Sequence, residues 1–210
     1  WTEAGHRTPE MIWQRIEKAM EANEWRLAKY LGRTLSDTDR VWLKRWIALH
    51  RSPDGANNDG RFEQAHPYRE AMLSHATRRL ARWDGPAARE LWQRSRPRYA
   101  FTSEQIQRTE TYIVSNLVRS AGEEDYALIR QVAVGSGDLR VHEARIRSAL
   151  RREDWRQVLR WIADLPRTER DQKSWMYWSA RALEGMGETK AATAVYEQVA
   201  KDRSYHGFLA

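Results

Sequence analysis

A segment near the middle of the chain has the residue types that bind anionic ligands. Residues 78–98 contain seven arginines against two acidic residues, a local balance of +5. Guanidinium groups match carboxylates and phosphates, and the interleaved Trp83 and Trp92 carry rings that stack on sugars or bases. The segment predicts a substrate-binding surface formed by Arg78, Arg79, Arg82, Arg89 and Arg94. The alternative is that both tryptophans pack in the core and the arginines form a solvated face.

Other groups of polar residues give weaker predictions. Residues 140–160 contain seven arginines and three acidic residues, a balance of +4, and there Arg147 and Arg151 share a helix face. A solvated face also explains this segment. His66 and Glu70 have i, i+4 spacing, but two ligands without a third do not define a metal site. No metal or cofactor is predicted, and no acidic residue has the context of a catalytic group.

The composition is that of a folded, basic protein. Among 210 residues, 36 are Lys or Arg and 29 are Asp or Glu, which gives a net charge of +7, and hydrophobic residues make up 41%. That hydrophobic fraction excludes a disordered chain, and no apolar run is long enough to span a bilayer. The absence of cysteine excludes disulfides, thiolate zinc sites and cysteine nucleophiles.

Almost all of the chain is predicted to be helical, and these helices must position the residues described above. Thr8, Pro9 and Glu10 predict a helix start, with an end near Asn23, and Ser36 with Asp39 resembles a capping box. A second helix is expected over 24–32 and a third from Ser36. Later helices are expected over 62–81, 86–95, 102–120, 123–134, 138–151, 154–165, 169–186 and 188–201. Turn-forming residues predict an exposed loop at 51–60.

Degenerate repeats run along the chain. The segments around Tyr126, Trp155 and Lys190 share an acidic start followed by apolar positions, at spacings of 29 and 35 residues, and residues 22–32 resemble the same unit. Helix-pair repeats of this length stack because one pair cannot bury its apolar face alone. We therefore predict an all-α fold, an α-superhelix or solenoid of irregular tetratricopeptide-like helix pairs. The apolar helical stripes predict a set of core tryptophans: Trp13, Trp42, Trp46, Trp155, Trp161, Trp175 and Trp178.

Residues 152–210 resemble one protein family. An acidic start and Trp155 lead to Leu165 and Pro166, followed by Trp175, Tyr177-Trp178, residues 180–183 and an alanine-rich helix with Tyr196. The tail, RSYHGFLA, is similar to a Tyr-Tyr-Gly-x-Leu-Ala segment in which His206 replaces the second tyrosine. These features resemble the non-catalytic superhelical region of the soluble lytic murein transglycosylases, periplasmic bacterial enzymes that cleave peptidoglycan.

The resemblance implies a catalytic domain outside this chain. In the family, one glutamate in a Glu-Ser pair protonates the glycosidic oxygen and then promotes closure of a 1,6-anhydromuramoyl ring, and a Gly-Leu-Met-Gln segment follows. Neither string occurs here: the chain has Ser103-Glu104, and Met186 lies in a Gly-Met-Gly sequence. We expect residues 1–210 to form a single superhelical domain, with a possible sub-boundary at the 51–60 loop. This domain is expected to be inactive alone. The resemblance also implies a periplasmic location, after removal of any signal peptide.

Three functions remain open at this stage. The first is an accessory domain that holds peptidoglycan strands and stem peptides for its own C-terminal catalytic domain, with other cell-wall proteins as further partners. The second is a free-standing tetratricopeptide-like adaptor that binds a protein segment. The third, a basic helical-repeat RNA binder, fits the net charge of +7 but lacks a regular repeat with variable code positions, so nucleic acid is disfavoured.

Overall fold

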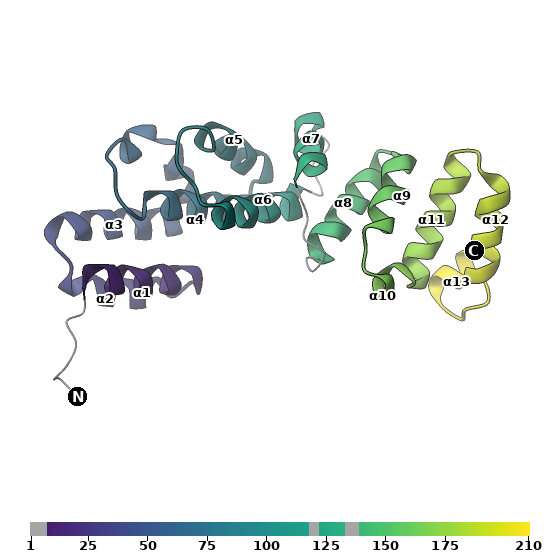
Figure 1. Cartoon of the computed structure of the whole chain (residues 1–210), viewed down its shortest axis with the longest axis horizontal. Helices are drawn as coiled ribbons and strands as arrows, with labels where there is room; N and C mark the ends of the chain where they lie inside the picture. Colours follow the sequence, from purple (N-terminus) through teal and green to yellow (C-terminus); the bar gives the residue numbers. More distant parts are fainter. Residues whose placement is uncertain (1–7, 118–121, 133–138) are drawn as a thin grey trace. The chain divides into compact units, whose positions relative to one another are not determined.

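The computed structural model describes residues 8–117, 122–132 and 139–210. Those residues form helices and turns without a β-strand, which confirms the predicted all-α class (Figure 1). The chain divides into an N-terminal unit, Trp1–Thr109, and a C-terminal unit, Glu110–Ala210. The boundary between them falls within a single helix, α6 (Ser103–Leu117).

The N-terminal unit is built from helices whose starts are fixed by local caps. Thr8 accepts a hydrogen bond from the Met11 amide and so begins the first helix, while Ser36 accepts one from the Asp39 amide, as the capping patterns predict. The elements in order are α1 (Pro9–Glu21), α2 (Trp25–Leu31), η1 (Gly32–Thr34), α3 (Asp37–Arg51), η2 (Pro53–Asn57), η3 (Asp59–Phe62), α4 (Arg69–Ala81) and α5 (Gly85–Ser95).

The C-terminal unit consists of helices that pack on their neighbours in sequence. After α6 come α7 (Glu123–Gln131), α8 (Leu139–Arg151), α9 (Trp155–Ala163), α10 (Arg167–Arg170), α11 (Lys173–Gly185), α12 (Thr189–Val199) and α13 (Tyr205–Leu209). Helix α9 packs against both α8 and α11, and α11 packs against α12. Figure 1 shows α8 with α9, and α11 with α12, as hairpins of adjacent helices. The predicted helix-pair organisation is confirmed here.

Three of the helix pairs share one turn. The residue two positions after α1, α8 and α11 has a positive φ: Asn23 at 67°, Glu153 at 53° and Gly187 at 82°. In each turn the next amide bonds to a carbonyl five residues earlier, as in Glu24 to Ala19, at 2.8 to 3.0 Å. This is the Schellman arrangement that ends helices. The common turn supports the predicted repeat. Trp155 and Thr189 are the first residues of the helices that follow two of these turns, so they are equivalent positions of the repeat. The predicted alignment of Trp155 with Lys190 is therefore wrong by one position.

Tryptophans occupy the cores of both units. Trp13, Trp42 and Trp46 are almost completely buried in the N-terminal unit, as are Trp161 and Trp175 in the C-terminal unit, and this confirms their predicted role. Trp155 and Trp178, also predicted as core residues, are only half-buried. Gly185 shows how closely helices approach, because a Cβ atom built on it would lie 2.4 Å from Trp155 Nε1.

Several predicted boundaries differ from the structure. Residues 62–68 are not part of α4, because Pro67 cannot occupy a helix interior, and helix 169–186 is divided into α10 and α11. The predicted loop at 51–60 forms 3₁₀ turns instead, with Pro53 and Ala56 buried. The helix expected over 123–134 ends earlier, at Gln131, because Val132 is extended. The expected helix end at residue 120 and the start at 138 lie outside the described residues. Where the structure describes the chain, none of its helices has the length and apolarity needed to cross a bilayer.

Candidate functional site

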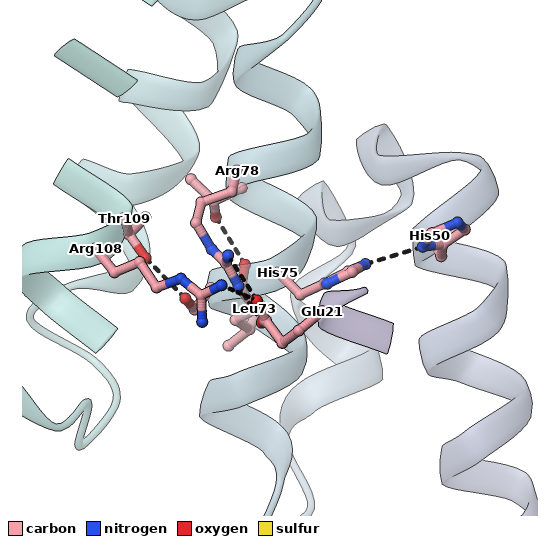
Figure 2. A network of polar contacts seen from close by, with 9 residues as sticks. Glu21, His50, Leu73, His75, Arg78, Arg108 and Thr109 are labelled. Atoms are coloured by element: carbon pink, nitrogen blue, oxygen red, sulfur yellow. Dashed lines mark hydrogen bonds and ion pairs between the residues drawn. The ribbon is translucent and has the colours of Figure 1, made fainter. Parts of the chain in front are cut away.

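Arg78, the first of the predicted binding arginines, points into the N-terminal unit. Its Nη1 donates to Glu21 Oε2 at 3.0 Å, across 57 positions of sequence. Arg108 on α6 also forms an ion pair with Glu21, so this carboxylate lies between two guanidinium groups (Figure 2). The side chains of Arg78 and Glu21 are 12% and 19% exposed. This partly buried contact joins α1, α4 and α6, and it occupies Arg78 in the structure of the unit itself.

A second set of buried polar contacts lies beside this ion pair (Figure 2). His50 Nδ1 and His75 Nε2 are 3.1 Å apart, and their rings stack. Ser74 and Thr109 share a hydrogen bond of 2.7 Å. Burial, reinforced by the positive charge of Arg78, lowers the pKa of His75 to about 2. The imidazole is therefore neutral in the folded protein across ordinary pH.

The other four predicted arginines do not form one surface with a common role. Arg89 is buried, 6% exposed, and donates to Gln93 Oε1 at 2.9 Å. Arg79 and Arg94 are hydrogen-bonded to side-chain oxygens of the same unit, whereas Arg82 is exposed. The substrate-binding role of these residues stays a prediction, and the exposed members of the segment are the ones available for it.

The two tryptophans of this segment have different environments. Trp92 is 2% exposed and packs against Phe101, with ring centroids 4.7 Å apart. Trp83, in the turn between α4 and α5, is 70% exposed. The core interpretation therefore holds for Trp92, and Trp83 is left as a ring that a ligand could contact beside Arg82.

The second basic segment, 140–160, contributes to a pocket of about 420 Å³ between α7, α8 and α9. Arg145 is buried there: its Nε donates to the Ile129 carbonyl at 2.9 Å, and its guanidinium lies 4.9 Å from the Trp161 ring centroid. Burial lowers the pKa of Arg145. Arg147, by contrast, is exposed and pairs with Glu143 at 2.8 Å. The segment is thus part core and part solvated face.

His66 and Glu70 have separate partners. His66 Nε2 lies 3.4 Å from Asp39 Oδ1, and its ring packs between Trp13 and Trp42, while Glu70 pairs with Arg69 at 2.7 Å. Burial lowers the pKa of His66, and its hydrogen bond to the Asp39 carboxylate opposes that effect. In the described part of the chain, no three His, Asp or Glu side chains are grouped as metal ligands.

An open groove of about 600 Å³, formed by α2, η1 and α3, is not among the sites predicted from the sequence. Its lining contains six basic residues: Arg26, Lys29, Arg33, Arg40, Lys44 and Arg51. The described lining residues include no Asp or Glu. The sequence does contain a signal for this groove, but the signal is periodic rather than a local excess of charge. The spacing places four lining residues on one helix face: Arg40, Lys44, Ile47 and Arg51.

Comparison with known proteins extends the resemblance from residues 152–210 to the whole chain. Soluble lytic murein transglycosylases of Escherichia coli K12 and Salmonella typhimurium are each 24% identical over 211 aligned residues. The alignment covers 100% of this chain and 33% of those proteins, so the chain spans about a third of their length. No protein-family model matches the chain.

Solved structures agree with this result. An inactive mutant of the lytic transglycosylase Slt from Pseudomonas aeruginosa has a TM-score of 0.86 and 27% identity, over 96% of this chain and 33% of that one. The 70 kDa soluble lytic transglycosylase of Escherichia coli gives a TM-score of 0.64 at 23% identity, again over 96% of this chain and 33% of that one. The predicted fold class is confirmed by these neighbours. Along its whole length, this chain is a homologue of one part of the soluble lytic murein transglycosylases.

Proposed function

We propose that this chain is the superhelical accessory part of a periplasmic soluble lytic murein transglycosylase. In this proposal it holds peptidoglycan strands while a C-terminal catalytic domain outside the chain forms the 1,6-anhydromuramoyl product. The observation that carries the proposal is the alignment of 100% of this chain with only 33% of its transglycosylase relatives. A helical homologue of one part of such an enzyme is best explained as a region that positions substrate or catalytic domain.

The absence of a recognisable catalytic glutamate supports an accessory role. Glycosidases need a carboxyl group whose pKa is raised in a closed cleft. Burial, together with the negative charge of Glu21, raises the pKa of Glu17, but Glu17 lies beside the structural ion pair of Glu21 with Arg78 and is not in a Glu-Ser sequence. In the proposal, the chain supplies positive surface and the catalytic domain supplies the chemistry.

Sedimentation with purified sacculi tests this proposal. The full chain is expected to co-sediment with sacculi, and binding should weaken as salt is raised, because exposed charges are screened over about 8 to 10 Å at moderate ionic strength. Failure of the folded chain to bind sacculi at any salt concentration would contradict a substrate-holding role. Binding to a protein segment in its place would favour a tetratricopeptide-like adaptor.

The predicted arginine surface is tested with variants that spare the structural arginines. Reversing Arg78 or Arg89 would disturb the fold, so the informative change is Arg82→Glu with Arg94→Glu, both exposed. Each exposed ion pair contributes about 0 to 1 kcal/mol, so we expect a several-fold loss of sacculus binding. Lys201→Glu with Arg203→Glu, also exposed, is the control with the same charge change. Equal binding by the two double variants would make residues 78–98 a solvated face.

A further inference from the structure

We propose that the basic groove formed by α2, η1 and α3 binds the anionic stem peptides of peptidoglycan. This inference rests on the proposed function, which brings the chain to peptidoglycan, and it assigns one ligand class to one surface. The groove volume of about 600 Å³ lies within the range of roughly 300 to 1,000 Å³ found for ligand sites. It therefore has room for a short peptide rather than for a single ion.

Within the described residues, most basic side chains of the groove form no ion pair, although the exposed Asp37 carboxylate pairs with Arg40 and attracts Lys44. Among the residues that the structure describes, Arg26, Lys29, Lys44 and Arg51 form no ion pair. Arg40 is the exception, since it pairs with Asp37 at the solvent edge and also donates to the Arg33 carbonyl at 3.4 Å. This differs from residues 78–98, where Arg78 and Arg89 are occupied within the protein. Of the two basic surfaces, the groove thus has more basic side chains that are available to bind a ligand carboxylate.

The helices bring like charges together along each wall. Lys29 and Arg33 are four residues apart on one wall, and Arg40 and Lys44 are four apart on the other. Lys29 lies in α2 and Arg33 in η1, whereas Arg40 and Lys44 share α3, where like charges at this spacing repel each other and destabilise the helix slightly. A carboxylate bound between the walls would remove that repulsion and accept charge-assisted hydrogen bonds. The arrangement is therefore favourable for a ligand that carries more than one carboxylate.

Apolar and aromatic side chains complete the lining and favour a peptide over a nucleic acid. Leu43 and Ile47 line the groove between the basic residues, which suits methyl groups such as those of alanine. The two rings that could stack on bases are already in contact with arginine: Arg26 lies 4.9 Å from the Trp25 ring centroid and Arg33 lies 5.1 Å from that of Tyr30. Base stacking would have to displace these cations.

The double variant Lys29→Glu with Lys44→Glu tests the inference. Both side chains are exposed, one on each wall, so the fold should be retained. The ligands are soluble peptidoglycan fragments carrying their stem peptides, and the same glycan fragments after removal of the peptides. We expect the wild-type chain to prefer the peptide-bearing fragments and the variant to bind them about tenfold more weakly. Lys190→Glu with Lys201→Glu, exposed and outside the groove, is the control with the same charge change.

The outcomes separate this inference from the proposed function. Sacculus binding by the wild-type chain, together with equal affinity for fragments with and without peptides, would overturn the groove assignment and leave the proposed function standing. Equal affinity of the groove and control variants would overturn it as well. Tighter binding of a single-stranded oligonucleotide, lost only in the groove variant, would reassign the groove to nucleic acid. If the wild-type chain binds neither sacculi nor fragments, both proposals fail.

Discussion

The imidazole of His75 makes the stability of the N-terminal unit sensitive to acid. Its side chain is 5% exposed and contacts His50 and the Trp46 ring. Burial is the main reason for its pKa of about 2, and the positive charges of Arg78, Arg79 and Arg108 act in the same direction. In the unfolded chain, the same side chain titrates near its ordinary value of 6.5.

The sign and size of the effect follow from proton linkage. Between about pH 6.5 and pH 2, the unfolded chain holds a proton on His75 that the folded chain does not, so the free energy of unfolding decreases as pH falls below 6.5. At about pH 5, protonation stabilises the unfolded chain by about 2 kcal/mol through this residue, and above about pH 7.5 by almost nothing. Any folded pKa below about 4 gives nearly the same value at pH 5, because His75 stays neutral there.

Urea unfolding of the wild type and of His75→Gln, followed by tryptophan fluorescence, measures this effect. Glutamine keeps a group that can hydrogen-bond to His50 but takes up no proton in this range. Between about pH 7.5 and pH 5 the wild type should lose about 2 kcal/mol more of its unfolding free energy than His75→Gln does. His206→Gln is the control, because His206 lies outside this cluster in the C-terminal unit.

A general destabilisation by His75→Gln does not affect this test, because the quantity compared is the loss of unfolding free energy between about pH 7.5 and about pH 5 and not the unfolding free energy at one pH. The lowered pKa of His50 and His66 leaves some acid sensitivity in every variant. An equal loss in the wild type and His75→Gln would refute the reasoning, since His75 would then be protonated within the folded protein.

Three further predictions concern contacts and activity. Glu21→Gln should lower the unfolding free energy by about 2 to 3 kcal/mol in urea titrations, because Arg78 loses its partly buried charge partner; Glu143→Gln, in the exposed pair with Arg147, should change it by at most about 0.5 kcal/mol. Gly185→Ala should cost about 1 to 3 kcal/mol in thermal unfolding, since its Cβ would lie 2.4 Å from Trp155 Nε1; unchanged stability would show that the ring moves aside freely. The 210-residue chain should release no anhydro-muropeptides from sacculi, as judged by chromatography; such release would reveal a catalytic group that lacks the family context.

Helix positions could be predicted where the signal is local. Thr8 and Ser36 begin their helices through hydrogen bonds to amides three residues ahead, and a sequence shows such spacing directly. The start of α4 was missed because Phe62 continues an apolar pattern, yet it is 1% exposed within a 3₁₀ turn. The break between α10 and α11 was missed because no Pro or Gly marks Asp171 and Gln172.

The use of each arginine could not be read from the density of arginines in the sequence. Arg78 donates a hydrogen bond to Glu21, which is 57 residues away in the sequence. Arg145 donates one to the carbonyl of Ile129 on a neighbouring helix. These partners depend on which helices pack together. A window with high positive charge therefore predicts where arginines occur, while the number available to a ligand is fixed by tertiary contacts.

The groove shows that counting charges along the sequence can also overlook a basic surface. Its basic residues come from 26–33 and 40–51, and part of each segment faces the core, where Ala28 and Trp46 are buried. Counting charge along one helix face would have separated Arg40, Lys44 and Arg51 from the buried face. That count still needs the packing of α2 on α3, because one wall of positive charge is an ordinary solvated face. Two opposed walls, whose described lining residues include no Asp or Glu, form the anion site that we propose.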